Sequence, residues 1–349
     1  MKSVAPVREA LPVFTTPAGE AAVKTAYERV LAHWSAPHSE LFVPTSFGSV
    51  HVVASGREDA PPILLLPAYF ATAAAWYRNA GALSSSYRVY AVDLPGEANP
   101  SVPTRPISSL DELAQCMGEL MDGLGVDRAH LVGNSFGGFL AAVLAMRAPE
   151  RVLSLTLISP AAVVHGILPF YLHVFLPKAI DLLAPWIPGH VRRTRRSLRW
   201  AFAGIPPDRY WAPLFYQVLL HGSSVNRVFP KVFSSAELRR IAGIPALLLV
   251  GDHERIYRPA AAIRAAKRLI PGIETRVIPH AHHVAAIANP DAVSRALLDF
   301  LARQHLPIPV ATVGGDGSGP GTLSEPPDHE ELDSASSGRS AAPGRRRGA

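Results

Sequence analysis

Short runs of apolar residues alternate along most of the chain with longer segments whose apolar positions recur every three or four residues. Short apolar runs are typical of strands buried on both faces. Segments with this periodic spacing are typical of helices with one apolar face. The runs predict strands over 63–66, 88–93, 130–132, 153–158, 246–250 and 275–278, preceded by two strands within 41–54 around the turn Phe47-Gly48-Ser49. The spacing predicts helices over 18–34, 110–124, 260–269 and 291–303, and one that ends at Met146. Together they predict an α/β fold, with a mostly parallel sheet covered by helices on both faces.

This alternation stops between residues 161 and 235, where Pro and aromatic residues are frequent and short helices are predicted. An insertion there would lie over the carboxyl ends of the strands, where ligands bind in open α/β sheets. We therefore predict a helical lid over 161–235, between two parts of an α/β core over 39–160 and 236–305. The aromatic side chains of the lid can line a hydrophobic pocket or form the lid's own core.

The two ends of the chain differ from this pattern. We predict an N-terminal helical extension over 1–38. Gly, Pro and Ser dominate from residue 307 onward and no periodicity persists, so we predict a disordered tail over 306–349.

The motif Gly133-Asn134-Ser135-Phe136-Gly137 lies between a predicted strand and a predicted helix. This is the context of a nucleophile elbow, a sharp strand-to-helix turn that projects a serine hydroxyl above the sheet. Glycines two residues before and after the serine allow the strand and helix backbones to approach each other. Ser135 is therefore the predicted nucleophile of a serine hydrolase.

A serine hydroxyl needs a neighbouring base, and the base needs a partner that orients it. In chains with such an elbow the acid follows the serine and the histidine comes last. Asp252 and Glu254 follow one late strand, and His280, His282 and His283 follow the last strand. The spacing alone leaves both acids and all three histidines open, with a metal site at the histidines as a further alternative.

The chain resembles bacterial α/β-hydrolases of the carboxylesterase NP (naproxen esterase) type from about residue 16 to residue 301. The matching stretches are residues 43–48, 76–77, 133–138, 232–238, 251–259 and 279–290. The resemblance implies the α/β-hydrolase fold with an eight-stranded-type sheet. It also implies carboxylic-ester hydrolysis through an acyl-enzyme, a small hydrophobic ester as substrate, and no cofactor.

The resemblance further assigns the site residues. It implies that His283 is the base, because a proline follows seven residues later, and that Glu254 is the acid, three residues after a glycine. His280 and His282 are then interpreted as ordinary polar loop residues. The backbone N–H groups of Tyr69 and Phe136 are implied as the oxyanion hole. The chain departs from the family where Pro67-Ala68 replaces His-Gly, and where His282 replaces the glycine before the histidine.

Other functions remain compatible with these residues, because fold and triad are shared by several activities. A lactonase, an amidase, a carbon–carbon-bond hydrolase or a perhydrolase would use the same three side chains. A ligand-binding protein without catalysis is an alternative from another class, and the Pro67-Ala68 departure is the feature in its favour.

Charge and composition limit the partners. Lys and Arg number 34 against 28 Asp and Glu, and two arginine clusters, over 192–199 and 345–347, carry much of the excess. The first cluster is mainly a solvated helix face by its pattern, although such a cluster can also attract anionic substrates or a membrane surface. Because no nucleic-acid-binding motif accompanies the basic residues, we predict no nucleic-acid partner.

The same composition indicates a cytoplasmic enzyme. Cys116 is the only cysteine, so an intramolecular disulfide is impossible. The N-terminal stretch lacks the continuous apolar run of a signal peptide. Prolines and charged residues interrupt the apolar stretch 167–188, so we predict no stable membrane insertion. The oligomeric state stays open.

Overall fold

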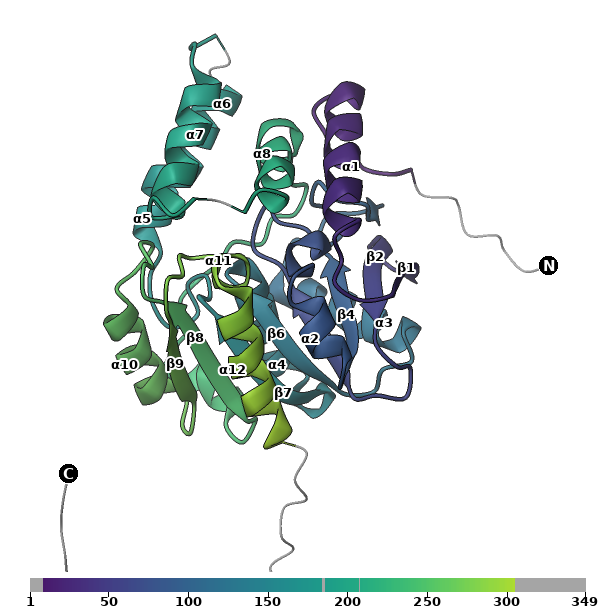
Figure 1. The fold of residues 1–349 in the computed structure, drawn as a ribbon, viewed down its shortest axis with the longest axis vertical. Coiled ribbons are helices and arrows are strands. Elements are labelled where there is room, and N and C mark those ends of the chain that lie inside the picture. The colour runs from purple at the N-terminus through teal and green to yellow at the C-terminus, as the bar shows by residue number, and fades with distance from the viewer. Residues whose placement is uncertain (1–8, 184–185, 207, 305–349) are drawn as a thin grey trace, which may run out of the picture. The chain divides into compact units, whose positions relative to one another are not determined.

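The structure, a computed structural model, describes residues 9–183, 186–206 and 208–304. Its strands form one sheet in the order β1-β2-β4-β3-β6-β7-β8-β9 (Figure 1). They are β1 (His38–Thr45), β2 (Gly48–Ser55), β3 (Pro62–Leu66), β4 (Arg88–Asp93), β6 (Ala129–Asn134), β7 (Val152–Ile158), β8 (Ala246–Gly251) and β9 (Glu274–Ile278). β2 is antiparallel to both neighbours, and all pairs from β4 to β9 are parallel. The predicted α/β fold with a mostly parallel, eight-stranded-type sheet is confirmed.

A ninth strand, β5 (Val102–Pro103), pairs with β2 outside this order. It was not predicted, because two residues are too few to show a period. The predicted strands are otherwise present, with ends that differ from the prediction by at most three residues.

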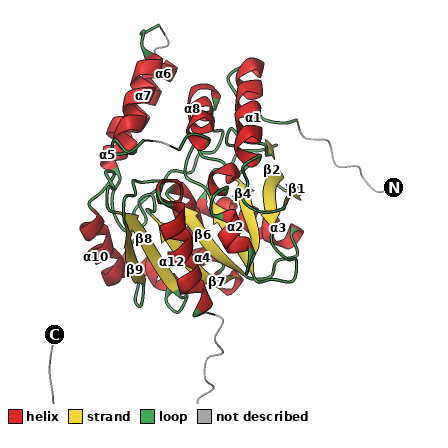
Figure 2. Ribbon diagram, viewed as in Figure 1, coloured by secondary structure: helices red, strands yellow, loops and turns green. Residues whose placement is uncertain are grey.

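Helices cover both faces of the sheet (Figure 2). Those outside residues 161–234 are α1 (Pro17–Leu31), α2 (Ala80–Ser84), α3 (Leu110–Gly123), α4 (Phe136–Arg147), α9 (Ser235–Leu238), α10 (Pro259–Leu269), α11 (Ala285–Ala288) and α12 (Pro290–Ala302). Three 3-10 turns join them, namely η1 (Ala73–Trp76), η2 (Pro149–Arg151) and η4 (Arg239–Ile241). The predicted long helices are confirmed, and α1 ends three residues earlier than predicted.

The strands are apolar throughout because both of their faces are buried. Leu64 and Leu66 belong to one core cluster, with side chains of α3, α4 and α10. Ile63 and Leu65 belong to a second cluster, with side chains of α2, α11 and α12. Successive side chains of a strand point to opposite faces, so one short apolar run contributes to both cores.

Residues 161–235 form short helices, as their composition predicts. These are α5 (Leu168–Phe170), the π-helical turn η3 (Tyr171–Phe175), α6 (Leu176–Leu183), α7 (His190–Ala201) and α8 (Trp211–His221). α6 and α7 lie side by side, and α8 packs on α1 (Figure 1). Aromatic side chains of α8 and its surroundings are buried in the core cluster that they share with α1 and one face of the sheet: Phe202, Trp211 and Phe215. The role of this segment as a lid stays a prediction.

The chain's single thiol lies in the core. Cys116 is on the buried face of α3, and burial raises the pKa of its thiol to about 12. Within the described ranges, no helix has the length and apolar character needed to cross a membrane. The predicted tail over 306–349 lies outside the described residues.

The turn between β6 and α4 depends on glycines. A Cβ atom built on Gly133 would overlap with the carbonyl of Gly137, and one on Gly137 with the carbonyl of Leu66. Because these neighbours are backbone atoms, they cannot move aside as a flexible side chain could.

We therefore expect Gly137→Ala to lower the free energy of unfolding by at least about 2 kcal/mol. The matched control is Gly118→Ala, in the interior of α3 with no atom within 4 Å of its added Cβ. That change should raise stability by about 0.5–1 kcal/mol, because alanine favours a helix. Urea unfolding of both variants measures the difference, and similar effects in the two would contradict the packing argument.

Candidate active site

Ser135 occupies the turn between β6 and α4, the strand–turn–helix context predicted for it. Its φ of 53° and ψ of −112° are strained for a residue with a side chain. Backbone hydrogen bonds hold this conformation: the Ser135 N–H donates to the Ile158 carbonyl at 2.9 Å, and the Ser135 carbonyl accepts from Ala161 N–H at 2.9 Å. At this turn Ser135 lines a pocket together with His283.

His283 lies within hydrogen-bond distance of this hydroxyl. Its Nε2 is 2.7 Å from Ser135 Oγ, and its Nδ1 is 2.7 Å from Glu254 Oε2. Glu254 follows β8 and His283 follows β9, and all three side chains are buried. The other oxygen of Glu254 accepts from the Ile256 N–H at 2.8 Å, which fixes the carboxylate. The structure thus brings together three residues that are far apart in the sequence.

The second acid candidate, Asp252, has a different environment. Its two oxygens accept hydrogen bonds from the backbone N–H groups of His280 and Ala281, both at 3.0 Å. Partial burial alone would raise the pKa of Asp252, but the bond with His253 and these backbone bonds outweigh it and lower the pKa to about 2. Asp252 therefore holds the loop that carries the histidine and does not contact His283.

The remaining histidines also lie apart from Ser135. His280 is exposed, at a positive φ of 51°. The interpretation of His282 as a polar loop residue is wrong, because it is buried and its ring lies 4.8 Å from the Phe202 ring. Burial lowers the pKa of His282 to about 4, so the ring is neutral near pH 7. Within the described part of the chain, no group of three His, Cys, Asp or Glu residues is arranged to hold a metal ion.

Asn134 is a part of the site that the sequence analysis did not single out. Its Nδ2 donates to the carbonyl of Ile158 at 3.3 Å and to that of His283 at 3.2 Å. The side chain therefore links the turn at Ser135 to the backbone of the histidine loop. The motif offered no signal for this role, because its second position accepts any residue.

The loop over residues 67–72 brings Tyr69 beside the turn. The rings of Tyr69 and Phe136 meet edge to face at 5.1 Å, and both residues line the same pocket as Ser135 and His283. The positive φ of this loop falls on Phe70, at 62°, and not on Ala68. Among the described residues, none accepts a hydrogen bond from the backbone N–H of Tyr69 or Phe136.

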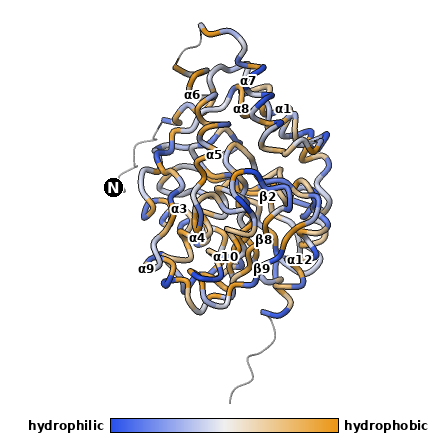
Figure 3. Tube along the Cα trace, turned by 90° about the vertical axis from the view of Figure 1, so that its left-hand side faces the viewer, coloured by the Kyte–Doolittle hydropathy of each residue, from blue (hydrophilic) through white to orange (hydrophobic). Residues whose placement is uncertain are grey.

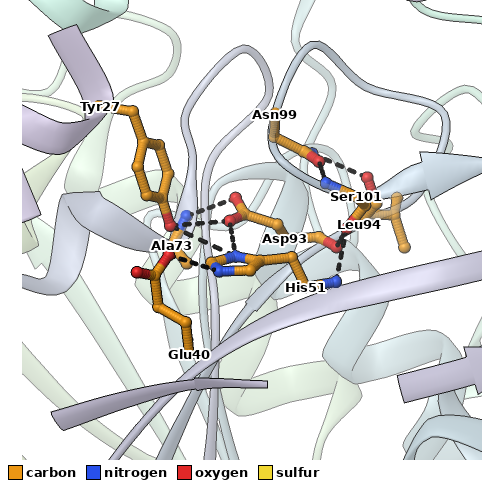
Figure 4. A network of polar contacts seen from close by, with 8 residues as sticks. All are labelled: Tyr27, Glu40, His51, Ala73, Asp93, Leu94, Asn99 and Ser101. Atoms are coloured by element: carbon orange, nitrogen blue, oxygen red, sulfur yellow. Dashed lines mark hydrogen bonds and ion pairs between the residues drawn. The ribbon is translucent and has the colours of Figure 1, made fainter. Parts of the chain in front are cut away.

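A buried polar network fixes the end of this loop (Figure 4). Asp93, the last residue of β4, accepts from the Ala73 N–H at 2.7 Å, from the Tyr27 hydroxyl at 2.9 Å and from His51 Nδ1 at 2.8 Å. His51 Nε2 lies 2.9 Å from Glu40. Burial alone would lower the pKa of His51, but its bonds with the two carboxylates raise it.

The pocket at Ser135 is apolar. Apart from Ser135 and His283, its walls are Tyr69, Phe136, Ala161, Ile167, Phe170, Tyr171, Phe175, Val228, Phe229, Pro230 and Ile256. Four of these aromatic residues belong to the 161–235 segment, so its aromatic side chains divide between the pocket and the core cluster that the segment shares with α1, the sheet and α12. Such walls suit a hydrophobic ligand.

Glu97 is a buried carboxyl group close to this pocket. Its Oε1 accepts from the Ser224 hydroxyl at 2.7 Å and from Asn226 Nδ2 at 3.5 Å. Burial raises the pKa of Glu97 to about 7, although these two bonds favour the charged form. Burial is the largest cause of the raised pKa of Tyr69, and the charge of Glu97 is the next largest.

We expect the Glu97→Gln variant to become more stable than the wild type as the pH rises from 5 to 8. The difference in the free energy of unfolding should reach at most about 3 kcal/mol. In the unfolded chain Glu97 ionises near its ordinary pKa of 4.5, whereas the folded state resists ionisation up to about 7. The wild type therefore loses stability across this window, and a glutamine, which can accept the same two bonds, does not. Urea unfolding at several pH values measures the difference.

The exposed Glu58→Gln is the matched control for that series. Unfolding curves of the Glu97 variant and the wild type that stay parallel from pH 5 to 8 would contradict the assigned burial.

Comparison with known proteins supports the resemblance seen in the motifs. The family described as an alpha/beta hydrolase fold matches residues 61–234. A protein named carboxylesterase YbfK from Bacillus subtilis (strain 168) is 33% identical over 287 residues, which are 79% of this chain and 92% of the relative. A second protein from the same strain, named uncharacterized carboxylesterase nap, is 34% identical over 281 residues. These are 78% of this chain and 90% of that relative.

Solved structures agree with this comparison. The crystal structure of naproxen esterase (carboxylesterase NP) from Bacillus subtilis has a TM-score of 0.73 and 31% identity. The match covers 82% of this chain and 99% of that one. The resemblance that the motifs indicate is thereby confirmed.

Proposed function

Since this chain belongs to the α/β-hydrolase fold family and is a carboxylic-ester hydrolase, we propose that it cleaves its esters through an acyl-enzyme on Ser135. The observation that carries this proposal is the chain of short hydrogen bonds from Ser135 through His283 to Glu254. Such a chain activates a hydroxyl that would otherwise be a weak nucleophile near pH 7.

In the first half of the reaction, Ser135 Oγ attacks the ester carbonyl carbon while its proton passes to His283 Nε2. Glu254 accepts the Nδ1–H, which leaves Nε2 free to take this proton, and it stabilises the imidazolium that forms. The tetrahedral intermediate then expels the alcohol, which receives the proton from His283. The acyl group remains bound to Ser135.

In the second half, a water molecule attacks the acyl-enzyme. His283 removes a proton from the water, and a second tetrahedral intermediate collapses as the same proton returns to Ser135 Oγ. The products are the carboxylic acid and the free enzyme.

The proposed oxyanion hole consists of the backbone N–H groups of Tyr69 and Phe136. Both residues line the pocket beside Ser135, and Phe136 N–H belongs to the first turn of α4, where the helix dipole favours negative charge. Ala68 stands where the family has glycine, but its φ is not positive, so a side chain is tolerated there.

A small hydrophobic ester is the substrate class that the pocket favours. The walls around Ser135 offer aromatic and aliphatic side chains to the acyl or alcohol group. The relatives are named as carboxylesterases, which favours ester hydrolysis over the amidase, lactonase, carbon–carbon-bond and perhydrolase alternatives.

We expect Ser135→Ala and His283→Ala each to lower kcat/KM for p-nitrophenyl esters by at least about 1,000-fold. Each removes a group that takes part directly in bond formation or proton transfer. Melting temperatures near that of the wild type would show that both variants fold. The matched control is His280→Ala, on the same loop but exposed and away from Ser135. Substantial turnover by either of the first two variants would refute the acyl-enzyme mechanism.

A second pair of variants distinguishes the roles of Glu254 and Asp252. Glu254→Gln should lower kcat by at least about 100-fold, because an amide can present N–H to Nδ1 and favour the wrong tautomer of His283. Asp252→Asn should keep kcat within a few fold but lower the free energy of unfolding by about 1 kcal/mol, because the loop bonds lose their charged acceptor. Steady-state kinetics and urea unfolding measure both effects, and an inactive Asp252→Asn beside an active Glu254→Gln would reverse the assignment.

A further inference from the structure

Exposed large apolar side chains are concentrated in one segment of the described chain. Eleven large apolar side chains of the described residues are exposed, and six of them lie between residues 168 and 187. They are Leu168, Leu172, Leu176, Leu183, Trp186 and Ile187. Leu183 and Trp186 are 75% and 77% exposed. A cluster of this kind marks an interaction surface, whereas scattered apolar residues need no explanation.

Most residues of α5, η3 and α6 are hydrophobic (Figure 3). Phe170, Tyr171 and Phe175 line the pocket at Ser135. The exposed Leu168, Leu172 and Leu176 recur every four residues, so they form a separate row along α5, η3 and α6. This exposed row is thus distinct from the aromatic side chains that face the pocket.

The next helix, α7, carries exposed positive charge. Four arginines on it are exposed and recur at helical spacing, so they form one stripe: Arg192, Arg195, Arg196 and Arg199. None of these four forms an ion pair with an acidic residue of the described chain. On another side of α7, Trp200 stacks on His173 at 4.2 Å between ring centroids, which joins α7 to η3.

The arginine stripe and the apolar tip are held next to each other. Arg193, in the first turn of α7, donates to the carbonyls of Pro188 at 3.0 Å and of Ile187 at 3.1 Å. Trp186 and Ile187 therefore project directly before the turn that carries Arg192. The α6–α7 hairpin thus combines exposed aliphatic side chains, an exposed tryptophan and exposed arginines.

We propose that the α6–α7 hairpin docks this protein onto anionic phospholipid surfaces. Leucine and tryptophan side chains enter the apolar boundary of a bilayer, and guanidinium groups bind the headgroup phosphates. Trp186 fits this role because its indole has an apolar body and a polar N–H, as at membrane interfaces. A second copy of the chain fits less well, because two arginine stripes would then lie close together and repel.

The test measures binding of the full chain to vesicles of phosphatidylcholine with or without about 30 mol% phosphatidylglycerol. We expect cosedimentation with the anionic vesicles only, and its loss at high salt as the charges are screened. Replacing the four stripe arginines by glutamine should weaken binding at least about tenfold. The matched control replaces four exposed arginines elsewhere, which changes the net charge equally: Arg239, Arg240, Arg264 and Arg268. If both variants lose vesicle binding equally, the binding depends only on net charge, and the proposal is overturned.

A second measurement tests the apolar contact. Brominated lipid should quench the fluorescence of the bound wild type, because Trp186 is exposed whereas Trp34, Trp76 and Trp211 are buried. Trp200 is half-buried and stacked on His173, so Trp186→Phe should remove more of this quenching than Trp200→Phe does, while both variants still bind. Leu183→Ser should weaken binding severalfold, whereas Val277→Ser, at an exposed site on β9, should not. A concentration-dependent dimer that Leu183→Ser abolishes, without vesicle binding by the wild type, would assign the surface to a second copy. Ser135→Ala should bind as the wild type does, so failure of the proposed catalysis leaves this test intact.

Discussion

The backbones of β6 and α4 touch at the turn around Ser135, and this contact exists only because Gly133 and Gly137 have no side chains. The turn holds Ser135 in a strained conformation, and hydrogen bonds to Ile158 and from Ala161 offset the strain. Because the direction of the hydroxyl follows from this backbone, every other polar group of the site must be placed relative to the turn. The distances to His283 and from His283 to Glu254 depend on it.

The parallel sheet supplies these other groups from a single edge. Glu254 follows β8, His283 follows β9, and Tyr69 follows β3, so their loops emerge beside the end of β6. These loops lack the backbone hydrogen bonds of a sheet, and acidic side chains accept from some of their N–H groups instead. Asp252 accepts from the backbone of the histidine loop, and Asp93 accepts from the first residue of η1, after the Tyr69 loop. The rigidity of the site thus comes from a few carboxylates that bind backbone N–H groups.

The sheet, the long helices and the position of Ser135 in a strand-to-helix turn could be predicted from the sequence, because their determinants lie within a few neighbouring residues. The choice between Asp252 and Glu254 could not be made from spacing. The two acids differ in their partners on the distant histidine loop, where Glu254 meets His283 and Asp252 meets backbone N–H groups, and only the family resemblance indicated Glu254. His282 was misinterpreted for the same reason, since its burial against Phe202 is a long-range contact. Asn134 and Glu97 likewise owe their roles to distant partners.

The position of Cys116 makes the protein convenient for site-specific labelling. The chain has no other cysteine, and this thiol is enclosed in the core on α3 with its pKa raised to about 12. Maleimides and nitroxide reagents react with accessible thiolates, and the folded protein offers them none of its own. A single cysteine introduced on an exposed loop would therefore be the sole reactive group. A fluorophore or spin label could then be attached at a chosen position without first removing Cys116.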